Sequence, residues 1–164
     1  MRDLGQSGTE QIGSMIRSMS RAQFIERMKN PFLIAFIEGR PAQGFHTRVA
    51  TKNDAPPRAV EIFACVKAPD NPYLDRISIG RATNCDIVLR DASVSKLHAH
   101  IASVAGGTYT ITDNRSHNGT VVNGARLTVD QAQALRFGDS LQIGTVLAKF
   151  LDAGLLYDLS KAKG

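Results

Sequence analysis

The chain has 164 residues, of which 43% are hydrophobic and 21% charged, a balance typical of a soluble globular protein with one core and a short additional segment. Its formal net charge of +5 is modest, and the absence of tryptophan leaves few platforms for stacking bases, so we expect no nucleic-acid partner. Two cysteines predict reduced thiols in a cytoplasmic protein rather than a disulfide framework, and no apolar run approaches the roughly 18 residues of a membrane-spanning helix.

The first segment of the chain has a helical pattern. Apolar side chains recur three and four positions apart at Ile12, Met15, Ile16 and Met19. Ser20 and Gln23 have the spacing of a capping box, which predicts a new helix start after a break near Met19. We therefore expect an N-terminal helical extension over residues 1–38. Residues 39–58 are rich in glycine and proline and are predicted to be a linker.

From residue 59 onward the pattern changes to short runs typical of β-strands. Apolar or alternating runs occur at 62–66, 77–79, 86–89, 98–104, 108–112, 120–122, 140–143 and 145–151. Glycine-containing pairs that suit tight turns, such as Asn118-Gly119 and Asn123-Gly124, separate several of them. The pattern predicts an all-β sandwich or barrel over residues 59–152, followed by a C-terminal tail over 153–164.

The polar residues that stand out lie between the predicted strands. Three connections, Gly80 to Asn84, Ser93 to His98 and Asn114 to Thr120, carry guanidinium, ammonium, hydroxyl and carboxamide groups and no carboxylate. In a sandwich, loops gather at the two ends of the sheets. If these three share an end, their donors would suit a compact oxyanion such as phosphate.

Five short segments of this half, taken in order, carry a resemblance to a known family. They are Ile79-Gly80-Arg81, Asp86-Ile87-Val88-Leu89, Val94-Ser95-Lys96-Leu97-His98-Ala99, Asn118-Gly119-Thr120-Val121-Val122-Asn123-Gly124 and Leu135-Arg136-Phe137-Gly138-Asp139. Over about residues 59–152, their order and spacing resemble the forkhead-associated (FHA) domain. The resemblance implies a β-sandwich of about eleven strands that binds phosphothreonine peptides through loops at one end.

The resemblance also implies a role for individual loop residues. Arg81 resembles the arginine that contacts the phosphate or the peptide near it, and Ser95 resembles the serine that donates to a phosphate oxygen. Lys96 lies where the family has a polar or basic residue at the phosphate, and Asn118 resembles the asparagine that holds the peptide backbone. His98 resembles a buried histidine that braces the binding loops, so we expect it to be structural.

Turn residues complete the implied site. Gly80 and Gly119 are expected to support the loops, and Asn123 to order its own loop. The residue before Asn118 is often serine or threonine in the family and is His117 here. We hypothesise that a protonated His117 adds a charge contact to the phosphate, because imidazole changes charge near physiological pH.

Metal binding and catalysis find little support in the sequence. His98 and His100 would share one face of a strand, but no third ligand lies at metal spacing and Cys65 and Cys85 are isolated. Nothing resembles a nucleophile elbow, and Ser95 already has a role in the implied site. We therefore expect no metal, no cofactor and no enzymatic activity.

The favoured interpretation is a non-catalytic module that recruits a protein phosphorylated by a Ser/Thr kinase. The alternative is a structural or assembly module that uses the N-terminal helix to bind a partner or a second copy of the chain. A further hypothesis concerns Thr9 and Thr51, because either residue, once phosphorylated, could occupy the domain's own site or that of a neighbouring molecule.

Overall fold

The computed structural model describes residues 8–38, 58–69 and 71–162, which contain three helices and eleven strands. In chain order these are α1 (Thr9–Ser18), α2 (Arg21–Arg27), β1 (Phe32–Glu38), β2 (Arg58–Ala64), β3 (Ile77–Gly80), β4 (Ile87–Val88), β5 (Ala99–Val104), β6 (Thr108–Asp113), β7 (Thr120–Val122), β8 (Ala125–Arg126), β9 (Gln133–Leu135), β10 (Ser140–Ile143), β11 (Val146–Leu151) and α3 (Ala153–Ala162). The predicted linker over 39–58 lies outside the described residues except for its last position.

The strands form two sheets that pack face to face. One has six strands in the order β2-β1-β11-β10-β7-β8, and the other has five in the order β4-β3-β5-β6-β9. Phe63 and Phe150 of the first sheet and Ile101 and Ile111 of the second belong to one buried core cluster. This arrangement confirms the predicted β-sandwich.

Strand β1 corrects the predicted extent of the helical extension, because residues 32–38 form a strand. It lies between β2 and β11 and pairs antiparallel with both. Leu33 and Ala35 belong to the core between the sheets, whereas Phe32 and Ile34 belong to a second cluster on the opposite face. Because both faces of β1 are buried, its sequence has no polar alternation, and a period of two could not be recognised.

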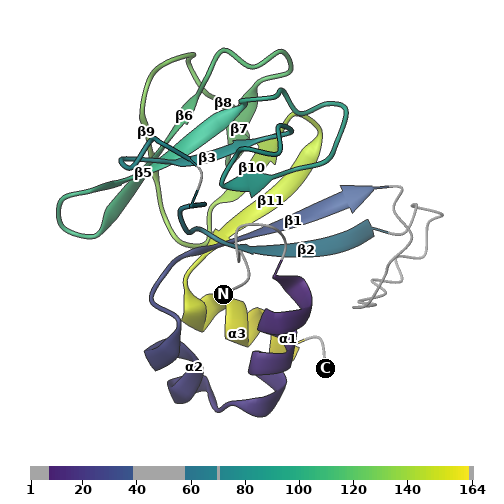
Figure 1. Ribbon diagram of the computed structural model, residues 1–164, viewed down its shortest axis with the longest axis vertical. Coiled ribbons are helices and arrows are strands. Elements are labelled where there is room, and N and C mark those ends of the chain that lie inside the picture. Colours follow the sequence, from purple (N-terminus) through teal and green to yellow (C-terminus); the bar gives the residue numbers. More distant parts are fainter. Residues whose placement is uncertain (1–7, 39–57, 70, 163–164) are drawn as a thin grey trace.

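The second cluster lies between the outer face of the first sheet and the three helices, which gather on one side of the molecule beside β1 and β2 (Figure 1). Ile12 of α1, Phe24 of α2 and Leu156 of α3 are fully buried in it. The apolar stripe of α1 is therefore covered by this chain's own sheet. The described helices are too short to span a bilayer.

The break between α1 and α2 occurs where the capping box predicts it. The N–H of Gln23 donates to the Ser20 hydroxyl at 3.3 Å, and the N–H of Ser20 donates to the Gln23 side chain at 2.9 Å. The C-terminal segment, in contrast, is not a simple tail over 153–164, because residues 153–162 form α3. Asp152 caps this helix by accepting the N–H of Leu155 at 2.8 Å.

Polar contacts fix the helices to one another and to the sheet. Arg21 of α2 makes two parallel hydrogen bonds with Asp158 of α3, at 2.8 and 2.9 Å. The Thr9 hydroxyl accepts the N–H of Ile62 on edge strand β2 at 2.9 Å. Thr9 is thus engaged in docking α1, and it could reach a binding site only after leaving β2. Thr51 lies outside the described residues.

A buried carboxylate fixes the β3–β4 region. Asp86 is inaccessible to solvent and accepts hydrogen bonds from the backbone of Ala68 at 2.7 Å and of Ser78 at 2.8 Å. The side chains of Lys67 and Asn71 donate to it as well, each at 3.0 Å. Asp86 therefore connects the segment after β2 to β3, whose last residue precedes Arg81.

Candidate functional site

The three connections that the sequence analysis selected for their polar side chains meet at one end of the sandwich. They are the β3–β4 connection over 81–86, the β4–β5 connection over 89–98 and the β6–β7 connection over 114–119. The N–H of Arg81 donates to the Ser95 carbonyl at 3.0 Å, which joins the first loop to the second. The N–H of His117 donates to the Ser95 hydroxyl oxygen at 3.0 Å, which joins the third loop to the second.

The Arg81 side chain is exposed, and one of its three guanidinium nitrogens is fixed by a hydrogen bond. Its Nε–H donates to the carbonyl of Val94 at 3.0 Å. In the described part of the chain, its two terminal nitrogens have no acceptor. An arginine restrained in this way loses little further freedom on binding, and its terminal nitrogens suit a two-pronged contact with an oxyanion.

Ser95 and Lys96 present two further donors beside Arg81. The Ser95 hydroxyl oxygen already accepts the N–H of His117, so its hydrogen is left to donate. Lys96 is exposed, and its ammonium contacts no acceptor among the described residues. Its carbonyl, in contrast, accepts the N–H of Ala82 at 3.1 Å, which fixes the backbone of the loop.

Asn118 is exposed and is oriented by the neighbouring loop. Its Nδ2 donates to the carbonyl of Ser93 at 2.8 Å, which leaves a second N–H and the side-chain oxygen for other partners. Ser93 is held in turn by the β10–β11 turn, because its hydroxyl accepts the N–H of Thr145 at 2.9 Å. Gly144 of this turn has φ +62°, and a Cβ there would lie 2.5 Å from the Ser93 carbonyl oxygen.

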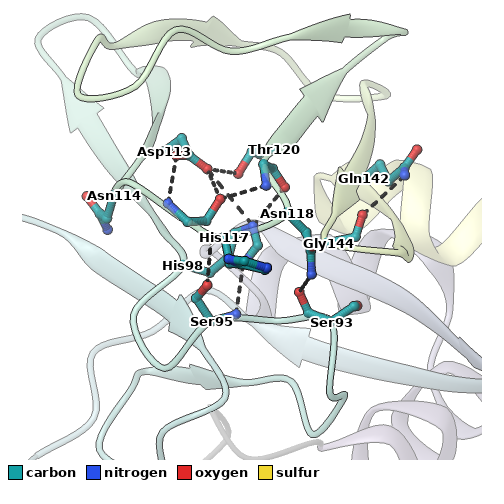
Figure 2. Close-up of polar contacts among 12 residues, drawn as sticks. Ser93, Ser95, His98, Asp113, Asn114, His117, Asn118, Thr120, Gln142 and Gly144 are labelled. Carbon is teal, nitrogen blue, oxygen red and sulfur yellow. Dashed lines mark hydrogen bonds and ion pairs between the residues drawn. The ribbon is translucent and has the colours of Figure 1, made fainter.

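His98 lies between the β4–β5 loop and the β6–β7 loop, with Ser95 on one side of its ring (Figure 2). It is fully buried, and its Nδ1 accepts the N–H of Ser95 at 3.0 Å. The ring hydrogen therefore lies on Nε2, which donates to the carbonyl of Gly119 at 2.8 Å. The structure thus places His98 where it braces the loops.

Asp113, at the end of β6, is a supporting residue that our sequence reasoning missed. Its carboxylate accepts the Ser116 hydroxyl at 2.6 Å, the Ser116 N–H at 3.0 Å and the Thr120 hydroxyl at 2.7 Å. Ser116 then accepts the N–H of Gly119 at 2.9 Å. Aspartate favours turns because its side chain accepts hydrogen bonds from nearby backbone groups, so a general turn signal was present in the sequence at Asp113.

Burial and hydrogen bonding set the charges of this support. Burial lowers the pKa of His98, although the Gly119 carbonyl and the Asp113 carboxylate favour the charged ring. Burial alone would raise the pKa of Asp113, but hydrogen bonds from Ser116 and Thr120 hold it below its usual value. At neutral pH His98 is therefore neutral and able to accept from Ser95, while Asp113 is charged.

These shifts predict that the fold weakens in mild acid. The native pKa of His98 lies below that of the unfolded chain, so the unfolded state takes up more protons as pH falls below roughly 6.5. The free energy of unfolding, measured by urea titration, should be highest above that pH and decrease towards pH 5. The substitution His98→Gln should reduce this dependence of the free energy of unfolding on pH. Burial also lowers the pKa of His100, so His100 contributes to the dependence in the same direction, which His100→Gln tests. An unchanged slope in His98→Gln would contradict the prediction.

The predicted supporting residues fall into two groups. Gly80 supports the site directly, because a Cβ there would overlap the carbonyl oxygen of Lys96. Gly119 has φ +84°, a conformation that favours glycine. Asn123, in contrast, lies at the far end of β7 from these loops, where it binds the Asp139 side chain at 2.9 Å.

The described residues contain no cluster of three or more histidine, cysteine or acidic side chains that could hold a metal ion. Both cysteines are buried and unpaired. Burial raises the pKa of Cys65 to about 12 and also raises that of Cys85, which makes both thiols weak nucleophiles at neutral pH.

Comparisons with known proteins agree with this architecture. The model of the FHA domain matches residues 77–144. The glycogen accumulation regulator GarA of Mycolicibacterium smegmatis is 32% identical over 155 residues, which cover 91% of this chain and 89% of GarA. The ABC transporter ATP-binding/permease protein Rv1747 of Mycobacterium tuberculosis is 44% identical over 79 residues, or 48% of this chain, but the match spans only 9% of the transporter.

The likeness extends to solved folds. The crystal structure of the MEK1 FHA domain superposes with a TM-score of 0.51 at 19% identity, over 80% of this chain and 96% of that one. Both sheets of the sandwich, the order of the loop motifs and the near full-length match to GarA lead to one conclusion. The chain belongs to the forkhead-associated (FHA) domain family.

Proposed function

We propose that this protein binds phosphothreonine peptides at the loop end of its sandwich and acts as a non-catalytic signalling adaptor. The observation that carries the proposal is the set of unused donors on Arg81, Ser95 and Lys96, on loops joined by hydrogen bonds. FHA domains are interaction modules that recognise phosphorylated motifs. A phosphate carries a charge of about −1.5 to −2 at neutral pH and three acceptor oxygens, which matches these donors.

Each residue has a distinct task in this proposal. The terminal nitrogens of Arg81 and the Lys96 ammonium neutralise the phosphate, and the Ser95 hydroxyl donates to one of its oxygens. Asn118 uses its remaining N–H and its side-chain oxygen to hold the peptide backbone beside the phosphothreonine. His98, Gly80 and Gly119 keep the loops in the binding conformation.

The partner is then a protein phosphorylated on threonine by a Ser/Thr kinase. GarA is named a regulator, and regulation by a phosphorylated partner is consistent with the role proposed here. The alternative assembly role would need another surface than the apolar stripe of α1, because Ile12 and Ile16 of that stripe are buried against the chain's own sheet.

A phosphothreonine peptide library, titrated beside its unphosphorylated counterparts, tests the proposal. We expect submillimolar binding of a subset of phosphopeptides and no measurable binding of the same sequences without phosphate. Phosphoserine versions serve as a second control. Equal binding of phosphorylated and unphosphorylated peptides, or no binding of either, would reject the adaptor role.

His117 provides a separate prediction about pH. It is exposed on the β6–β7 loop, and a charged imidazole there would attract the phosphate. We expect the ratio of wild-type affinity to that of His117→Ala to rise between pH 8 and 5.5. The ratio is the proper measure, because protonation of the phosphate near pH 6 weakens its contacts with the loops in both proteins and the ratio removes this shared loss. If the affinities of the wild type and of His117→Ala change with pH in parallel, His117 makes no charge contact with the phosphate.

A further inference from the structure

A cavity of about 560 Å³ opens along the side of the sandwich where the two sheets end. It lies between the β7–β8 hairpin, at the edge of the first sheet, and β9, at the edge of the second. Four of its lining residues, Val122, Asn123, Arg136 and Asp139, belong to the segments that carry the family resemblance, but no lining residue belongs to the three loops of the proposed phosphate site. Two arginines, Arg126 and Arg136, line it together with one carboxylate, Asp139.

Arg126 places this cavity next to the proposed peptide site. A side chain built on Gly119 would meet the Arg126 guanidinium carbon at only 2.7 Å, so this guanidinium lies directly over Gly119. Gly119 is the residue after Asn118, which is proposed to hold the peptide backbone. A peptide gripped by Asn118 therefore passes close to Arg126 on one side of the phosphothreonine.

The charges of the cavity are unbalanced. Within the described residues, neither guanidinium has a carboxylate partner, whereas Arg115 on the adjacent loop is paired with Asp130 at 2.6 Å. Asp139 is occupied by other groups, because it accepts the Asn123 side chain at 2.9 Å and the Arg136 backbone N–H at 2.8 Å. Two exposed guanidinium groups thus line the cavity with no carboxylate partner in the described part of the chain, a pattern that favours an acidic ligand.

We infer that this cavity extends the peptide site and selects partners with acidic residues close to the phosphothreonine, with Arg126 as the main specificity-determining residue. The inference rests on the proposed function, because it assumes that the phosphothreonine is held by the adjacent loops. Successive residues of an extended peptide are about 3.3 Å apart, so acidic residues within about three positions of the phosphothreonine reach Arg126 first and Arg136 further along.

The test compares matched phosphothreonine peptides by calorimetry. One series carries three aspartates after the phosphothreonine, a second carries them before it, and both are repeated with asparagines. We expect the wild type to prefer the acidic peptide roughly tenfold in one of the two series, and the preference to shrink as salt increases. Arg126→Gln should reduce the preference to less than about threefold, while its affinity for the asparagine peptide stays within about twofold of wild type.

Lys161→Gln is the matched control, because it removes the same charge from an exposed position on α3, on the other side of the molecule (Figure 1). Its preference should equal that of the wild type. The inference is overturned if the wild type binds acidic and neutral phosphopeptides alike, if the preference survives in both Arg126→Gln and Arg136→Gln, or if Lys161→Gln loses it equally. Failure to distinguish phosphorylated from unphosphorylated peptides would instead reject the proposed function itself.

Discussion

Arg81→Ala is expected to weaken phosphothreonine-peptide binding about a hundredfold. The substitution removes a guanidinium whose two terminal nitrogens would each make a charge-assisted hydrogen bond, and such bonds contribute on the order of 1.5–3 kcal/mol. A loss of about 3 kcal/mol corresponds to roughly a hundredfold in the dissociation constant. The Nε–H bond to Val94 restrains the side chain before the ligand arrives, so little of this energy is spent on ordering.

Arg81→Lys separates charge from geometry in the same experiment. Lysine keeps the positive charge but lacks the planar fork, so the affinity should fall by about tenfold rather than a hundredfold. Because Arg81 is exposed, both variants should unfold at nearly the wild-type urea concentration. An affinity of Arg81→Ala within threefold of wild type would show that the phosphate is bound elsewhere.

Asp86→Ala is expected to reduce the free energy of unfolding by about 3–5 kcal/mol, because Asp86 is fully buried and holds both the partly buried Lys67 and several buried donors. The variant would leave the Lys67 ammonium without its carboxylate at 3.0 Å. It would also leave the backbone N–H groups of Ala68 and Ser78 without their acceptor. Urea titration of the whole chain measures the change.

Asp75→Ala is the matched control for that experiment. Asp75 also forms an ion pair, with Arg76 at 2.9 Å, but its side chain is 69% exposed. Exposed pairs are screened by water and add little, so the stability should hardly change. The free energy of unfolding of Asp86→Asn should lie between those of Asp86→Ala and Asp75→Ala, because the asparagine amide oxygen can still accept one of the backbone hydrogen bonds. If Asp86→Ala unfolds at the same urea concentration as Asp75→Ala, the buried network is not a main source of stability.

Local patterns in the sequence predicted much of the fold. The break at Ser20 and most strands after residue 59 follow from capping and alternation, which depend on neighbouring residues. Strands β8 and β9 could not be found in this way, because they are two and three residues long and only Leu135 among their residues is buried. Helix α3 had a visible cap in Asp152, which we did not recognise as a helix start.

The candidate site, like the fold, has residues that local sequence patterns predict and residues that they do not. Arg81, Ser95 and Asn118 could be selected because they lie in recognisable motifs, and the structure brings them to one end of the sandwich. The residues that hold them were harder to find. Asn118 is held by Ser93, which lies 25 residues earlier, and Ser93 is held in turn by Thr145, which lies 52 residues after it. No local sequence pattern reports contacts over such separations.

Strand β1 has a consequence for how the molecule forms. Phe32 pairs with Leu151, so the middle of the first sheet joins an early segment of the chain to a late one. Such long-range pairing folds slowly, because a large loop must close before the contact stabilises it. During synthesis the edge of β1 that pairs with β11 stays unpaired until residues 146–151 have left the ribosome, and the cluster on its outer face is complete only when α3 follows. The interval in which this chain is most prone to aggregate therefore extends through β11 and α3.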